Sequence, residues 1–130
     1  MIIEIDLTRP VPPYEQIRTQ IATMIATGVL GSGARLPPIR QLAADLALAP
    51  NTVARAYREL EAEGLVTSRV RHGTTVAARS ATVPRTEVHR LLTQAAQSYA
   101  TLAHQLGVTA DDAEAAVRAE LARARPPRNY

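Results

Sequence analysis

Residues 36–66 read LPPIRQLAADLALAPNTVARAYRELEAEGLV, and this stretch decides the fold. Apolar residues recur at helical spacing in its first part and predict a helix from Ile39 to about Leu46. A second helix is predicted from Pro50, which suits a first helical position, to Gly64, a residue typical of helix ends. Only three or four residues join the two helices. That arrangement is typical of a helix-turn-helix.

The flanking residues extend this motif into a larger unit. A further helix is predicted upstream, beginning at Pro13 and ending before Gly28. Its apolar face is formed by residues 14, 17, 21, 24, 25 and 29. Downstream, residues 65–70 and 74–77 are β-rich runs around a glycine-containing turn, which predicts a hairpin. A hairpin directly after a helix-turn-helix is a wing, so residues 1–78 are predicted to form a winged helix-turn-helix DNA-binding domain.

The remaining residues are predicted to form a helical dimerisation domain. Residues 79–84 are the candidate linker, and residues 85–130 contain two helices, the first of which stops at Gly107. Thr109 and Asp112 nearly match a capping box at the start of the last helix. The first helix carries an apolar seam longer than its short partner can cover, so we expect a second copy of the chain to cover it in a two-fold homodimer. The seam consists of Val88, Leu92, Ala95, Tyr99, Leu102 and Leu106.

The predicted fold class is therefore mainly α with a small β-hairpin, an N-terminal winged helix-turn-helix followed by a two-helix dimerisation hairpin. A chain of 130 residues without cysteine offers little room for a deep catalytic cleft and no thiolate chemistry. It has no glycine-rich phosphate loop, and His89 and His104 lie too far apart for a metal pair on one helix. We expect no enzyme activity, catalytic residue, metal or cofactor. The acidic start and the lack of a long apolar run favour the cytoplasm over a membrane.

The placement of charge points to nucleic acid more clearly than the net charge of +3 does. All fifteen basic residues are arginine, whose planar guanidinium suits phosphate oxygens and guanine edges. Residues 33–79 hold seven arginines against four acids, and three of those acids lie in the C-terminal half of the second motif helix. The six arginines from the turn, both motif helices and the wing are expected to converge on one face. They are Arg35, Arg40, Arg55, Arg58, Arg69 and Arg71.

Individual residues of this face are expected to differ in role. Asn51 can bond an adenine edge, and Thr52 a base or a phosphate, although either can instead cap the helix. Arg55 and Arg58 share a helical face, so one of them can read a base while the other holds a phosphate. Arg35 and Arg40 are expected to clamp phosphates. The wing adds Arg69, Arg71, His72 and Gly73.

A series of anchored motifs resembles the GntR family of bacterial transcription regulators. The motifs are PYEQI at 13–17, GARLPPIRQLA at 33–43, PNTVARAYREL at 50–60, EGLV at 63–66 and GTTV at 73–76. The short tail looks like the YtrA-like subgroup, in which a tail of this kind dimerises. The resemblance implies DNA contacts from Arg35, Arg40, Asn51, Thr52 and Arg55, and from the wing around His72 and Gly73.

Three positions depart from the family pattern. Pro38 stands where the family usually has serine, which removes a hydroxyl cap from the helix that follows. Arg71 replaces a glycine of the wing, which puts the turn type in doubt and adds a charge. Thr75 replaces an aromatic residue, so the wing is expected to pack more weakly.

The function predicted from these observations is a dimeric, sequence-specific regulator of transcription, and more specifically a repressor. Its partner is expected to be double-stranded DNA with an inverted-repeat operator, because two recognition helices of a dimer meet two half-sites. The alternative is a winged helix that recognises proteins without sequence-specific DNA binding. A small-molecule effector between the tail helices is not expected, because their alanine content predicts tight packing with little cavity.

Overall fold

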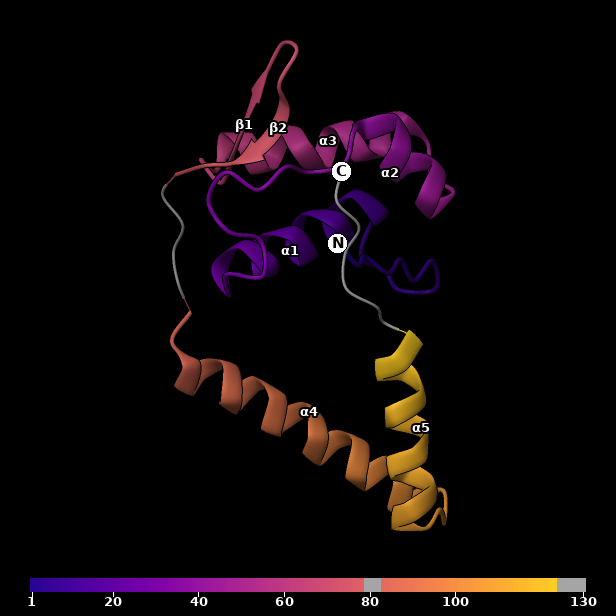
Figure 1. Ribbon diagram of the computed structural model, residues 1–130. Coiled ribbons are helices and arrows are strands. Elements are labelled where there is room, and N and C mark those ends of the chain that lie inside the picture. Colours follow the sequence, from indigo (N-terminus) through magenta and orange to yellow (C-terminus); the bar gives the residue numbers. More distant parts are fainter. Residues whose placement is uncertain (79–82, 124–130) are drawn as a thin grey trace. The chain divides into compact units, whose positions relative to one another are not determined.

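The computed structural model describes residues 1–78 and 83–123, and Figure 1 shows their helices and a single hairpin. The elements are α1 (Pro13–Ala26), α2 (Ile39–Leu46), α3 (Pro50–Ala62), β1 (Val66–Arg69), β2 (Gly73–Val76), α4 (Arg85–Gln105) and α5 (Ala110–Arg123). The predicted mainly helical fold with a small hairpin is confirmed. The chain divides into two compact units near Pro84. Residues 79–82 of the predicted linker and 124–130 of the predicted tail lie outside the described residues.

The core of the first unit is aliphatic and lies between α1 and α3. The buried apolar side chains of α1 stand four residues apart and are Ile17, Ile21 and Ile25. The expectation that Val29 belongs to this face is wrong. The helix ends at Ala26, Gly28 adopts a left-handed φ of 83°, and Val29 is 63% exposed. Leu30 is the next apolar residue to be buried.

Three residues connect α2 to α3, within the three or four that the sequence predicts. Ala47 ends α2 with a left-handed φ of 55°, a conformation that costs a residue with a Cβ atom about 1–2 kcal/mol. The next amide, of Leu48, donates a hydrogen bond of 2.9 Å to the carbonyl oxygen of Ala43. The buried phenol of Tyr57 donates to the carbonyl oxygen of Pro37 at 2.7 Å and so fastens the segment before α2 to α3.

The wing is larger than its two strands. β1 and β2 pair antiparallel with Val66 opposite Val76, and both valines are buried at the base of the hairpin. The turn before α2 runs along the other edge of β2, where the amide of Leu36 donates to Thr74 and the amide of Val76 donates to Ala34, each at 2.8 Å. The base of the wing is therefore fixed on both sides by backbone hydrogen bonds.

The second unit consists of α4 and α5, which meet at their connecting loop and diverge away from it (Figure 1). The predicted cap is confirmed, because the hydroxyl of Thr109 accepts a hydrogen bond of 3.1 Å from the amide of Asp112. The phenol of Tyr99 donates to the carbonyl oxygen of Ala113 at 2.7 Å and ties the two helices together. Within the described part of the chain, no helix has both the length and the apolar character needed to cross a bilayer.

Candidate nucleic-acid interface

α3 has a buried face and an opposite polar stripe. The side chains that anchor the helix in the core are Val53, Ala56, Tyr57 and Leu60. With 3.6 residues per turn, Asn51, Arg55 and Arg58 fall within about 60° of one another on the other side of the helix. All three are exposed. The burial of one face thus turns an amide and two guanidinium groups outward together.

The structure separates two interpretations that the sequence left open for Asn51 and Thr52. The N-cap position of α3 is Ala49, and no side chain caps this helix. Asn51 is therefore not a cap, and its exposed amide has no hydrogen-bond partner among the described residues. An amide that presents both a donor and an acceptor can pair bidentately with an adenine edge. Thr52 also does not cap the helix, and it is half-buried beside the stripe.

Arg35 contacts the wing directly. Its Nη2 donates a hydrogen bond of 2.9 Å to the carbonyl oxygen of His72. A Cβ atom at Gly73 would lie 3.5 Å from the Nε of Arg35, so the guanidinium lies close against the glycine backbone. The sequence predicts Arg35 as a phosphate clamp, and the structure adds that it supports the tip of the wing.

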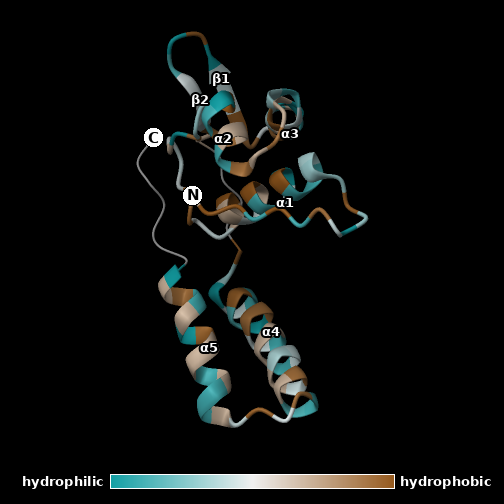
Figure 2. Ribbon diagram, turned by 90° about the vertical axis from the view of Figure 1, so that its right-hand side faces the viewer, coloured by the Kyte–Doolittle hydropathy of each residue, from teal (hydrophilic) through white to brown (hydrophobic). Residues whose placement is uncertain are grey.

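The wing tip keeps a left-handed turn despite its departure from the family pattern. Arg71 has a φ of 75° and Gly73 a φ of 71°, so arginine occupies a conformation that favours glycine. Arg69, Arg71 and His72 are exposed around Val70, which is itself 90% exposed, and Figure 2 shows the hydrophilic and hydrophobic residues of this loop. The loss of a hydroxyl cap at Pro38 is also confirmed, because no side chain caps α2.

Arg55 is the one arginine of the stripe whose side chain contacts an aromatic ring in the described residues. Its Cζ lies 3.8 Å from the centroid of the Tyr14 ring, and its Nε lies 3.8 Å from a carboxylate oxygen of Glu59. Tyr14 was predicted to share the apolar face of α1, but it is half-buried and lies against Arg55. Sequence reasoning missed this residue, because a tyrosine at helical spacing is usually part of the core.

The acids of α3 are engaged by other parts of the same unit. Arg18 of α1 pairs with Glu15, with Glu63 at 2.8 Å and with Glu59 at 3.8 Å. The guanidinium of Arg18 lowers the pKa of the Glu15 carboxyl and is itself held protonated. Glu61 accepts a hydrogen bond of 2.8 Å from the amide of Ser68 in β1. These contacts offset the negative charge at the C-terminal half of α3.

Six of the predicted site residues fall into two groups. The stripe of α3 joins Asn51, Arg55 and Arg58 on one face, and the wing joins Arg35, His72 and Gly73. Arg40 on α2 is exposed. No interaction among the described residues links Arg40 or the stripe to the wing. The convergence of all six arginines on one surface therefore stays a prediction.

Comparison with known proteins identifies the arrangement. Residues 13–76 match the family described as bacterial regulatory proteins of the gntR family. The HTH-type transcriptional regulator Rv1152 of Mycobacterium tuberculosis is 39% identical over 111 residues, which cover 85% of this chain and 87% of that protein. The chain belongs to the GntR family. It is accordingly a DNA-binding transcriptional regulator with a winged helix-turn-helix, and not an enzyme.

Two further similarities support the YtrA-like subgroup of GntR regulators. The HTH-type transcriptional repressor YtrA of Bacillus subtilis is 37% identical over 81 residues, which cover 62% of each protein. The solved structure of YtrA from Sulfolobus acidocaldarius, a GntR-family transcription factor, is 35% identical with a TM-score of 0.57 and covers 75% of this chain and 99% of that chain. The resemblance drawn from the sequence motifs is confirmed.

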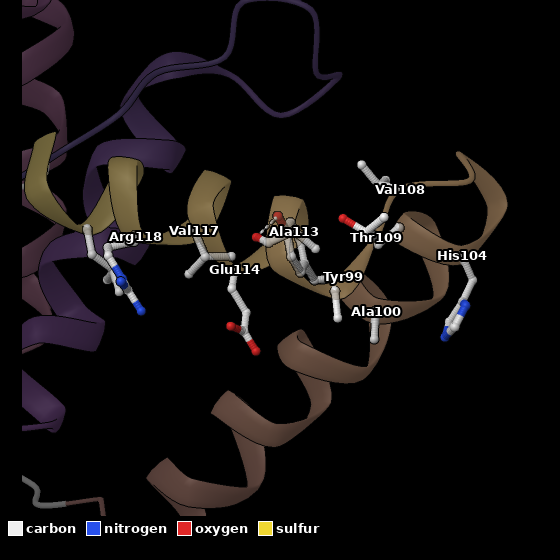
Figure 3. Close-up of a pocket in the computed structure, with 12 residues that line it drawn as sticks. Tyr99, Ala100, His104, Val108, Thr109, Ala113, Glu114, Val117 and Arg118 are labelled. Carbon is white, nitrogen blue, oxygen red and sulfur yellow. Dashed lines mark hydrogen bonds between the residues drawn. The ribbon is translucent and has the colours of Figure 1, made fainter.

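The tail of this GntR protein presents an uncovered apolar surface. All six residues of the predicted seam are exposed in the single chain, and the helices contain no buried residue in the part described. An open groove runs between α4 and α5, lined by Tyr99, Ala103, Val117 and other side chains that Figure 3 draws. The expectation of tight packing with little cavity is wrong, because the two helices diverge from their loop.

Proposed function

We propose that this protein is a homodimeric, sequence-specific repressor that acts in the cytoplasm on an inverted-repeat operator. The observation that carries the proposal is the outward stripe of α3, where Asn51, which does not cap the helix, lies in the first turn ahead of two exposed arginines. A recognition helix reads base edges with residues near its N-terminal end. The relative named a transcriptional repressor supports the direction of control.

The tail supports the dimer. Leu92, Leu102 and Leu106 are 68%, 50% and 70% exposed on one face of α4, and the groove beside them continues this apolar surface onto α5. Contiguous apolar surface of this kind usually marks an interface in a soluble protein. A second copy of the same two helices offers an equally apolar surface, and a two-fold arrangement would place two copies of α3 against two half-sites. Residues 1–78 would thus be the DNA-binding domain and residues 85–130 the dimerisation domain, joined by 79–84.

Footprinting with the purified full chain on the DNA upstream of its own operon tests the operator. We expect a protected inverted repeat, and binding that weakens steeply with salt in proportion to the phosphates neutralised. Asn51→Ala should cost about 1–3 kcal/mol and relax one base position, whereas Arg40→Ala should weaken all sequences alike. Arg90→Ala is the charge-matched control in the tail, where Arg90 pairs with Glu87. Recovery of a stable protein partner without any protection would instead support the protein-interaction module.

Sedimentation equilibrium at micromolar concentration tests the dimer. Leu102→Glu places a charge in the seam and should give a monomer. Gln97→Glu places the same charge on the opposite face of α4 and should leave the dimer intact. A parent protein that sediments as a monomer would refute the dimer and, with it, the inverted repeat.

A further inference from the structure

Tyr14 and Arg55 form a contact between α1 and α3 whose function the proposed repressor activity leaves unassigned. Tyr14 lies in the first turn of α1 and Arg55 in the second turn of α3. The 3.8 Å between the guanidinium carbon and the ring centroid places the cation over the face of the ring. A separation below about 6 Å gives a favourable cation–π interaction. The ring therefore restricts where this long, exposed side chain can lie.

The stacking leaves the hydrogen-bonding edge of Arg55 available. A guanidinium donates in its own plane, so a ring on one face does not obstruct its N–H groups. Arg55 makes no hydrogen bond among the described residues, and its Nε lies 3.8 Å from Glu59, beyond hydrogen-bonding distance. Arg58, one turn further along the same stripe, has no aromatic contact in the described part of the chain. It therefore offers a matched comparison.

We propose that Tyr14 is a positioning residue for DNA binding, whose ring holds the guanidinium of Arg55 ready to donate to a backbone phosphate. The proposal rests on the proposed use of α3 as the recognition helix. The ring holds Arg55 against α1, and Arg55 lies in the second turn of α3, whereas base edges are read by residues near the N-terminal end of a recognition helix. Fixing the side chain before binding lowers the entropy lost when the phosphate contact forms.

A double-mutant cycle on the full chain tests this role. The probe is a fluorescein-labelled duplex of mixed sequence and about 30 base pairs at low salt, because phosphate contacts do not depend on sequence. Tyr14→Phe keeps the ring and should bind within about twofold of the parent. Tyr14→Leu keeps apolar volume without the ring and should weaken binding by about two- to fivefold. That loss should vanish in an Arg55→Ala background and persist in an Arg58→Ala background.

Each contrary outcome has a distinct meaning. An equal loss for Tyr14→Phe and Tyr14→Leu would assign the effect to the hydroxyl and overturn the proposal. A Tyr14→Leu loss that persists without Arg55 would reduce Tyr14 to general packing and overturn it too, as would no loss at all. If the parent itself does not bind duplex DNA, the proposed function fails along with this inference; binding without coupling refutes only the inference.

Discussion

Replacing Arg71 by glycine should raise stability and lower DNA affinity at the same time. Arg71 holds a φ of 75° at the wing tip, a conformation that costs a residue with a Cβ atom about 1–2 kcal/mol. Glycine removes this strain but adds about 0.4–1 kcal/mol of backbone entropy to the unfolded chain. The free energy of unfolding should therefore rise by between zero and about 1.6 kcal/mol.

The loss of the Arg71 charge should lower the affinity for DNA. If Arg71 neutralises one phosphate, its removal makes the slope of log K against log salt shallower by about 0.9. Arg71→Asn is the matched variant, because asparagine tolerates the left-handed region and also lacks the charge. Both variants should therefore show the same shallower slope. Only the glycine variant should lose stability through the greater backbone entropy of its unfolded chain.

Urea denaturation and fluorescence anisotropy over a salt series measure the two effects. A glycine variant that is measurably less stable than the parent would contradict the strain argument. An unchanged salt slope in both variants would remove Arg71 from the phosphate contacts, whatever the stability result.

Further expectations concern the core and pH. Leu60→Ala empties a fully buried site on α3 and should cost about 2.7–5 kcal/mol of unfolding free energy in urea, whereas Val29→Ala at a 63% exposed site should cost little. The carboxyl of Glu15 has a lowered pKa in the folded state, so its stabilising contribution is present above the unfolded pKa and is lost as pH falls through the folded one. Glu15→Gln should therefore flatten the acid limb of a stability profile below the ordinary glutamate pKa of about 4.3, and an unaltered limb would argue against the pairing with Arg18.

Local signals in the sequence were sufficient to predict where the helices begin and end and which face of α3 is buried. Pro50 begins α3, Gly64 follows its end, and Thr109 caps α5. Each of these residues acts only on the few residues next to it. The buried face of α3 follows from spacing alone, and so does the polar stripe opposite it. These features depend on periods and caps that a single helix carries.

The features that the sequence did not predict depend on residues distant in the chain. Arg35 reaches His72 because the turn before α2 pairs with β2, and Tyr14 reaches Arg55 because α1 packs on α3. Neither pairing has a periodic signature. The groove of the tail was missed for a related reason, since alanine content indicates small side chains but not the angle at which two helices diverge.

The backbone hydrogen bonds at the base of the wing fix the distance between the hairpin and α3. Because β2 is tied to residues 33–36, and Pro37 to Tyr57, the hairpin tip stands at a set distance from the reading end of α3. If both the hairpin tip and α3 contact DNA, as proposed, the complex should tolerate little change in the length of DNA between the two contacts. Inserting one base pair between the two contacts should lower the affinity for DNA as much as losing one of the contacts, even when every contacted base pair is retained.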